Sequence, residues 1–205
     1  MIFDTIPVGQ IDTNCYLIGD ETEGVCAVVD PGGSPERVLE MVRRSGLKLE
    51  KILLTHGHYD HTGAVQALVD ADPAPGPAVY LHPADVREDD ARLYPPPAWG
   101  FNHFEDGQHL SVGGIDVRVL HTPGHSAGSV TLLAEDVMLC GDTLFAGSCG
   151  RCDLAGGDEQ QMLDSLKRLA GLEGNYKVCP GHGPLSTLDQ ERSGNSYVRM
   201  AVKWR

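Results

Sequence analysis

The sequence predicts an α/β protein in which two similar halves pack sheet against sheet, with helices on the outside. Each half starts with short apolar strands, and one strand of each half ends at an aspartate, Asp30 or Asp142. Each half continues with a helical segment and a strand that ends at a histidine beside glycine, His56 or His182. This order favours an αββα sandwich of two mixed β-sheets flanked by helices, formed by residues 1–205 as one domain.

Apolar runs separated by turn residues define the elements of the first half. The turn Asp30-Pro31-Gly32-Gly33 ends one strand, and Ser34 and Pro35 then match a helix cap and a first helical turn. The predicted strands are 3–8, 15–18, 25–29, 51–55 and 78–82, and the predicted helices are 34–46, 62–69 and a short acidic helix at 83–93.

The second half repeats the pattern after an irregular segment at 94–107. Three consecutive prolines, 95–97, exclude a helix there, and aromatic side chains in this loop could either rim a pocket or pack on one another. The predicted strands are 115–121, 129–133, 137–140 and 177–179, and the predicted helices are 159–170 and 187–203.

Composition narrows the class of protein and partner. The formal charge is −13, which repels a nucleic-acid backbone and favours small-molecule partners. No apolar run is long enough to span a membrane, and the N-terminus reads as a strand instead of a signal peptide, so a cytoplasmic protein with reduced cysteines is expected. Cys149 and Cys152 have redox-motif spacing, but their surroundings read as a loop, and no functional dithiol is expected. The oligomeric state is not readable.

Residues 56–61 place four potential metal ligands within six positions. They are His56, His58, Asp60 and His61, and the apolar strand 51–55 leads directly into them. Imidazole and carboxylate donors of this kind suit zinc, iron and manganese. The strand therefore delivers a metal-binding loop at its carboxyl end, which is where α/β proteins place their sites.

Three further donors follow apolar strands farther along the chain. His125, Asp142 and His182 each lie beside a glycine, which allows the backbone to approach an ion closely. Together with the first loop they give five histidines and two aspartates. Seven donors suit two ions that share one bridging carboxylate, and exceed the needs of a single tetrahedral ion.

The pattern His56-x-His58-x-Asp60-His61, with His125, Asp142 and His182, resembles the signature of the metallo-β-lactamase superfamily, whose fold is an αββα sandwich. The resemblance implies that His56, His58 and His125 hold one divalent ion. It implies that Asp60, His61 and His182 hold a second ion, with Asp142 as the bridge. Asp30 matches a position that supports the histidine loop from behind the ligands. Zinc is the expected metal, and iron and manganese accept the same ligands.

A narrower similarity is to single-domain glyoxalase II-like hydrolases. It rests on residues 141–158 and on Pro180-Gly181-His182-Gly183-Pro184 with Glu191-Arg192. By this resemblance, Arg151 takes the place of a basic residue that contacts the glutathione end of the substrate. Asp153 stands where those enzymes carry a tyrosine, and their longer helical C-terminal extension is missing. Recognition of glutathione is therefore left open.

The resemblance implies hydrolysis of a small acyl thioester by a hydroxide that bridges the two ions, with Asp60 and Asp142 as catalytic residues. A mononuclear Fe(II) persulfide dioxygenase using His56, His125 and Asp142 is an alternative, and so is a lactonase or β-lactamase on the same core. A metal-bound scaffold without turnover is the non-enzymatic alternative.

Overall fold

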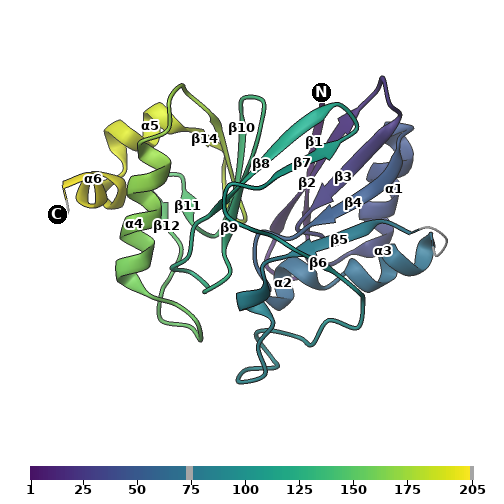
Figure 1. Ribbon diagram of the computed structural model, residues 1–205, viewed down its shortest axis with the longest axis horizontal. Coiled ribbons are helices and arrows are strands. Elements are labelled where there is room, and N and C mark those ends of the chain that lie inside the picture. The colour runs from purple at the N-terminus through teal and green to yellow at the C-terminus, as the bar shows by residue number, and fades with distance from the viewer. Residues whose placement is uncertain (73–75, 204–205) are drawn as a thin grey trace.

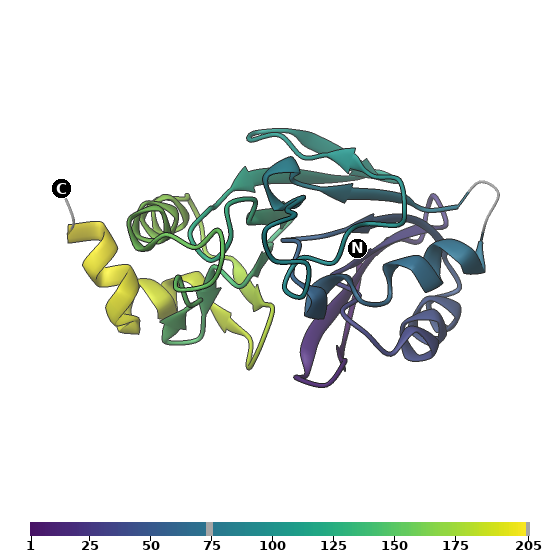
Figure 2. The ribbon, with the colours of Figure 1, turned by 90° about the horizontal axis from the view of Figure 1, so that it is seen from below.

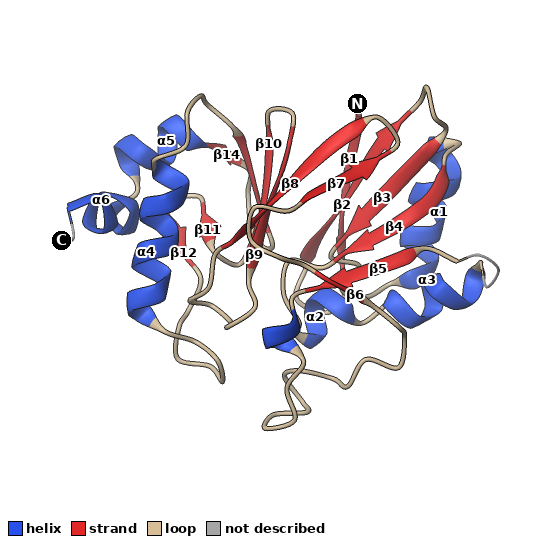
Figure 3. Ribbon diagram, viewed as in Figure 1, coloured by secondary structure: helices blue, strands red, loops and turns tan. Residues whose placement is uncertain are grey.

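Two six-stranded sheets face each other in residues 1–72 and 76–203, the part of the chain that the computed structural model describes. Helices cover the outer face of each sheet, with α1 and α3 on one side and α4, α5 and α6 on the other (Figures 1 and 3). The predicted αββα arrangement of two mixed sheets is confirmed.

The first sheet has the strand order β1-β2-β3-β4-β5-β6. Its strands are β1 (Ile2–Val8), β2 (Thr13–Asp20), β3 (Val25–Val29), β4 (Lys48–Leu53), β5 (Ala78–Leu81) and β6 (Asn102–His103). The strands β1 to β3 pair antiparallel, whereas β3 to β6 pair parallel. Parallel pairing brings the carboxyl ends of β3, β4 and β5 to the same edge of the sheet.

The second sheet has the order β14-β13-β10-β9-β8-β7. Its strands are β7 (His109–Val112), β8 (Ile115–His121), β9 (Val130–Ala134), β10 (Val137–Gly141), β13 (Lys177–Pro180) and β14 (Ser186–Thr187). The strands β10 and β13 are parallel and the other pairs are antiparallel. A separate hairpin joins β11 (Leu144–Phe145) to β12 (Ser148–Cys149).

Alternation along the buried strands divides their side chains between two apolar layers. On β2, Tyr16 and Ile18 belong to the cluster between the sheets, whereas Cys15 and Leu17 belong to the cluster beneath α1 and α3. On β10, Leu139 faces the other sheet, and Met138 and Cys140 join the cluster beneath α4, α5 and α6. Since both faces of these strands are covered, their sequences are continuously apolar.

The helices are α1 (Pro35–Ser45), α2 (Tyr59–Thr62), α3 (Val65–Ala71), α4 (Glu159–Ala170), α5 (Leu188–Gly194) and α6 (Ser196–Lys203), with a 3₁₀ turn η1 (Pro83–Asp85). The Asp158 side chain caps α4 by accepting a hydrogen bond of 2.8 Å from the amide of Gln161. None of the helices within the described ranges has both the length and the apolar character required to cross a bilayer.

Several predicted elements differ from the structure. The predicted helix at 83–93 is wrong: only η1 forms, and the following residues make turns stabilised by Asp90, which accepts hydrogen bonds from the amides of Arg92 and Leu93. The predicted helix 187–203 is two helices separated at Asn195. Ser34 does not cap α1 with its side chain and adopts a positive φ of 51°.

We expect Leu132→Ala to lower the free energy of unfolding by about 2–5 kcal/mol, because the substitution leaves a cavity between the two sheets. Leu132 on β9 is fully buried there. The measurement is urea denaturation. Leu185→Ala, at a leucine that is 38% exposed, is the matched control and should change the same quantity by less than about 0.5 kcal/mol.

Candidate metal centre

The first group of donors lies on the loop and short helix that follow β4. His56 and His58 precede α2 in the chain, while Asp60 and His61 lie in its first turn. This helix begins earlier than the helix predicted at 62–69, so the motif itself is partly helical. The backbone of Gly32 packs against the carbonyl of Asp60, and a Cβ atom at this glycine would overlap that oxygen. The turn after β3 therefore holds the start of α2 in place.

The three histidines 56, 58 and 125 come together although 67 positions separate His58 from His125. Their candidate ligand atoms lie within 4.8 Å of one another. The ring of His56 lies 4.5 Å from that of His58 and 4.9 Å from that of His125. His58 Nδ1 is 3.0 Å from His125 Nε2, so these two nitrogens point at one place.

A second group consists of Asp60, His61 and His182, again with ligand atoms within 4.8 Å. Asp60 Oδ2 is 3.1 Å from His182 Nε2 and 3.4 Å from His61 Nε2. Asp142 lies between the two groups. Its Oδ1 is 3.5 Å from His61 Nε2, and its Oδ2 is 3.5 Å from His125 Nε2. The structure thus brings all seven predicted donors together around Asp142.

Several buried atoms of these donors have no hydrogen-bond partner. They include Nε2 of His56, Nε2 of His61 and Oδ1 of Asp142. A buried polar atom without a partner costs free energy, and metal ligation removes that cost. The donor set of imidazoles and carboxylates therefore fits divalent cations, and the unpaired atoms are located where such cations would be held.

The neighbours of each histidine determine which nitrogen is available to a cation. The carbonyl of Arg151 accepts a hydrogen bond of 2.8 Å from His125 Nδ1, which places the proton there and leaves Nε2 with a lone pair. His61 Nδ1 makes a contact of 2.9 Å with Asp30 Oδ2, which likewise leaves its Nε2 facing the centre. These partners fix the orientation of both rings.

The donor histidines differ in the direction in which their surroundings shift the pKa. Burial, together with the neighbouring His125, lowers the pKa of His58 to about 3, and burial likewise lowers the pKa of His56. Both rings are therefore neutral at pH 7, as metal ligands must be. Burial opposes the charged form of His61, but Asp30 and Asp142 outweigh this effect and raise its pKa.

Asp30 supports the histidine loop in the position that the sequence predicted. It has a φ of 51°, a strained value for a residue other than glycine. Its two oxygens accept hydrogen bonds of 2.7 Å from the amide and the hydroxyl of Thr55, and Oδ2 also contacts His61. One carboxylate therefore joins the end of β3 to the loop after β4.

Glycines surround Asp142 closely. A Cβ atom at Gly150 would overlap the carbonyl oxygen of Asp142, and one at Gly181 would overlap its Oδ1. Gly141 has a φ of 47° and faces Thr55 at similarly close range. These approaches explain why glycine accompanies the donors along the chain.

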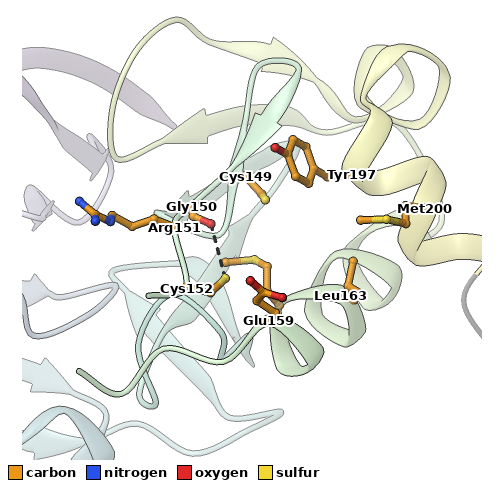
Figure 4. Close-up of a pocket in the computed structure, with 9 residues that line it drawn as sticks. Cys149, Gly150, Arg151, Cys152, Glu159, Leu163, Tyr197 and Met200 are labelled. Atoms are coloured by element: carbon orange, nitrogen blue, oxygen red, sulfur yellow. Dashed lines mark hydrogen bonds between the residues drawn. The ribbon is translucent and has the colours of Figure 1, made fainter. Parts of the chain in front are cut away.

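Arg151 contributes to the centre through its backbone. Its side chain is 62% exposed and forms a two-pronged ion pair with Asp153, with both nitrogen–oxygen distances 2.7 Å. Figure 4 shows this side chain extending away from the labelled side chains of Tyr197 and Met200. These two residues line a pocket of about 440 Å³ between the segment 149–152, α4 and α6.

Cys149 and Cys152 line the same pocket as free thiols. Burial raises the pKa of both thiols to about 11, so they are protonated at neutral pH and poorly nucleophilic. The pair does not open a helix, because the segment 150–153 that follows β12 has no regular structure.

The loop 94–107 does not act as a single unit. Tyr94 is buried, with its ring 4.8 Å from that of His58 and its hydroxyl donating to the carbonyl of Ala155. Trp99 and Phe101 pack on each other and on the outer layer of the first sheet. Only the start of the loop therefore touches the centre.

Two residues near the donors were not predicted from the sequence. Thr13 Oγ1 lies 3.4 Å from Asp60 Oδ2. Asp85 is a buried carboxylate that contacts both the histidine loop and the loop after His125. Asp85 lies four residues after the end of β5, whereas Asp30 and Asp142 directly follow their strands. The strand-end signal did not single it out, because residues 83–93 read as a helix.

The family model for the metallo-beta-lactamase superfamily matches residues 8–182, which contain all seven donors. The chain belongs to the metallo-beta-lactamase superfamily. A relative within the superfamily is hydroxyacylglutathione hydrolase GloC of Haemophilus influenzae, which is 32% identical over 217 residues. That alignment covers 97% of this chain and 98% of the relative.

Solved structures of the superfamily superpose over nearly the whole chain. The B3 metallo-beta-lactamase BLEG-1 has a TM-score of 0.85 and 35% identity, covering 96% of this chain and 99% of that one. TTHA1623 in a di-iron-bound form has a TM-score of 0.84 and 36% identity, covering 95% and 99%. ETHE1 from Myxococcus xanthus has a TM-score of 0.80 and 28% identity, covering 99% and 91%. The superfamily fold and the donor cluster together imply divalent metal ions.

We expect Gly150→Ala to lower the metal content of the purified protein, because the added Cβ atom would displace Asp142 and crowd His125 Nδ1, 3.2 Å away. Elemental analysis of folded protein measures the effect. Gly194→Ala is the control, since a Cβ atom there meets nothing within 4 Å. A Gly150→Ala protein with the metal content of the wild type would contradict the expectation.

Proposed function

We propose that the protein is a metal-dependent hydrolase that cleaves a small acyl thioester, in the manner of glyoxalase II. The observation that carries the proposal is the pair of donor groups that meet at Asp142, with unpaired ligand atoms facing inward. The similarity to GloC over nearly the full length supports a hydroxyacyl-glutathione or a related thioester as the substrate.

In this proposal the two groups hold two divalent ions, zinc being the expected metal. His56, His58 and His125 would hold the first ion, Asp60, His61 and His182 would hold the second, and Asp142 would contribute to both. When bound, such ions would lower the pKa of a water and polarise the carbonyl of an acyl substrate. TTHA1623 was obtained in a di-iron form, so the metal analysis of this protein measures iron as well as zinc and manganese.

The chain's own residues orient the reaction. Burial favours the neutral form of Asp60, yet hydrogen bonds from His182 and His61 hold the pKa of this carboxyl well below its usual range. Asp60 therefore stays an acceptor and would orient a nucleophilic water by accepting a hydrogen bond from it. Thr13 Oγ1, 3.4 Å from Asp60 Oδ2, limits the positions that this carboxylate can adopt.

The leaving group explains why a thioester suits this centre. A thiol has a pKa near 8.5, so a thiolate departs with little need of a proton from the protein. An amide nitrogen would need a general acid, and the seven donors are all assigned to ligation in the proposed arrangement. An activated acyl compound is therefore the substrate class that demands least from the remaining residues.

We expect Asp142→Ala and His58→Ala each to abolish thioester hydrolysis, because each substitution removes a proposed ligand. Steady-state assays with a panel that includes S-lactoylglutathione, a lactone and a β-lactam measure the effect on folded, metal-quantified protein. His109→Ala is the control, since His109 is an exposed partner of Asp116. Near-normal turnover by either ligand variant would refute the assignment.

The same preparation tests the metal and the competing chemistry. Elemental analysis should find two equivalents of divalent metal per chain, and removal of the metal by a chelator should remove the hydrolysis. A single iron equivalent, with oxygen uptake in the presence of glutathione persulfide, would refute the hydrolase. It would instead support a mononuclear dioxygenase that uses His56, His125 and Asp142.

Arg151→Ala should raise KM for a glutathione thioester by up to about fivefold with kcat unchanged, because an exposed ionic contact contributes at most about 1 kcal/mol. The carbonyl that accepts from His125 remains in this variant. Arg43→Ala is the control, since Arg43 is 69% exposed and forms an ion pair with Glu40 on α1. An unchanged KM would remove Arg151 from the proposed substrate contacts.

A further inference from the structure

Asp85 is the last residue of η1, four residues after the end of β5, and only 3% of its surface is exposed. Its carboxylate accepts three hydrogen bonds. Oδ2 accepts from the amide of Gly57 at 2.8 Å and from the hydroxyl of Ser126 at 2.7 Å. Oδ1 accepts from the amide of Gly128 at 2.6 Å.

These three donors belong to two different ligand loops. Gly57 lies between His56 and His58, whereas Ser126 directly follows His125. The two loops come from opposite sheets, since one follows β4 and the other follows β8. One side chain therefore ties together the backbone on both sides of the three-histidine group.

The fit around Asp85 leaves little freedom for movement. A Cβ atom at Gly57 would lie 2.8 Å from the carbonyl oxygen of Asp85, and one at Gly128 would lie 2.7 Å from its Cγ. Contacts this short do not occur for real Cβ atoms, so both positions require glycine as long as Asp85 stays where it is. A shift of the carboxylate would move both loops.

Charge adds a second reason to connect Asp85 with the histidines. The three donors that it accepts from are uncharged, and Arg87, whose ion pair is with Asp89, interacts with Asp85 only electrostatically. The carboxylate also interacts electrostatically with His125. A buried carboxylate is costly when no cation balances it, and a divalent ion in the three-histidine group would supply positive charge on this side of the centre.

We propose that Asp85 is a positioning residue that sets the spacing of His56 and His58 relative to His125 and thereby the affinity of the first metal site. The proposal rests on the proposed function for the presence of metal in the centre, but it does not depend on the substrate. Among the described residues, no hydrogen bond joins Asp85 to a donor side chain, and Asp85 acts through Gly57 and the segment 126–128.

Glu191 provides a matched control for a purely structural role. It is also a carboxylate that is 3% exposed, and its Oε2 accepts hydrogen bonds of 2.8 Å from the amide of Gly147 and from Asn195 Nδ2. Neither partner belongs to a donor loop. Glu191→Gln therefore perturbs a buried, hydrogen-bonded carboxylate without touching the metal centre.

The test measures Zn²⁺ affinity by competition with a chelator on metal-free protein. It uses the His182→Ala background, which removes one ligand of the second group so that the three-histidine group provides the remaining tight site. In this background, Asp85→Asn keeps the shape but replaces an acceptor by a donor and removes the charge. We expect the dissociation constant for Zn²⁺ to rise about 10- to 100-fold, as for other residues that orient metal ligands.

Ser126→Ala removes the hydrogen bond to Asp85 and the 2.7 Å contact with Ser129 Oγ, leaves the carboxylate intact and serves if Asp85→Asn does not fold. It should weaken Zn²⁺ binding in the same direction by a smaller factor, and Glu191→Gln should leave it unchanged while lowering resistance to urea. If Asp85→Asn or Ser126→Ala binds Zn²⁺ as tightly as the His182→Ala parent, the proposal is overturned. An equal loss of Zn²⁺ affinity in Glu191→Gln would overturn it as well. If the parent His182→Ala protein binds no Zn²⁺ tightly, the proposed metal site fails, and the proposal fails with it.

Discussion

All the donors depend on one constraint, which is that strands from both sheets end at a common edge of the sandwich. The parallel pairs β3–β4 and β10–β13 bring the residues that follow these strands to that edge. Asp30 and His56 follow the first pair, and Asp142 and His182 follow the second. Figure 2, seen from below, shows the turns and short helices that leave this edge between the two halves of the molecule. The buried layers between and outside the sheets hold the strand ends in place.

Buried carboxylates then fix the orientation of the donors that meet at this edge. Asp30 orients His61 and Thr55, Asp142 lies between the two donor groups, and Asp85 connects the loops of the three histidines. All three aspartates are buried. Asp30 and Asp85 accept hydrogen bonds from more than one residue, whereas Asp142 lies 3.5 Å from histidine nitrogens of two different loops. His61 attracts Asp30 and Asp142, and divalent cations would neutralise the carboxylates more strongly. Stability and metal binding are therefore linked in this part of the fold.

The sequence was most informative where the signal is local. The strand 51–55 and the cluster at 56–61 are adjacent in the chain, so both the element and its chemistry could be predicted. The sandwich followed from the repeated order of elements. Asp85 could not be found in the same way, because its partners Gly57 and Gly128 are 28 and 43 positions away. Short strands such as β11 and β12 were also missed, since two residues carry no periodicity.

The contact between Arg151 and His125 has a consequence for which residues this segment can accept. His125 is held by a main-chain carbonyl, which every amino acid possesses, while the guanidinium at the same position points into solvent. The side chain at position 151 can therefore change without disturbing the imidazole behind it. The neighbouring glycine has no such freedom, because its missing Cβ atom makes room for Asp142. Adjacent positions in one short segment are thus under opposite structural constraints, since one tolerates any side chain and the other requires glycine.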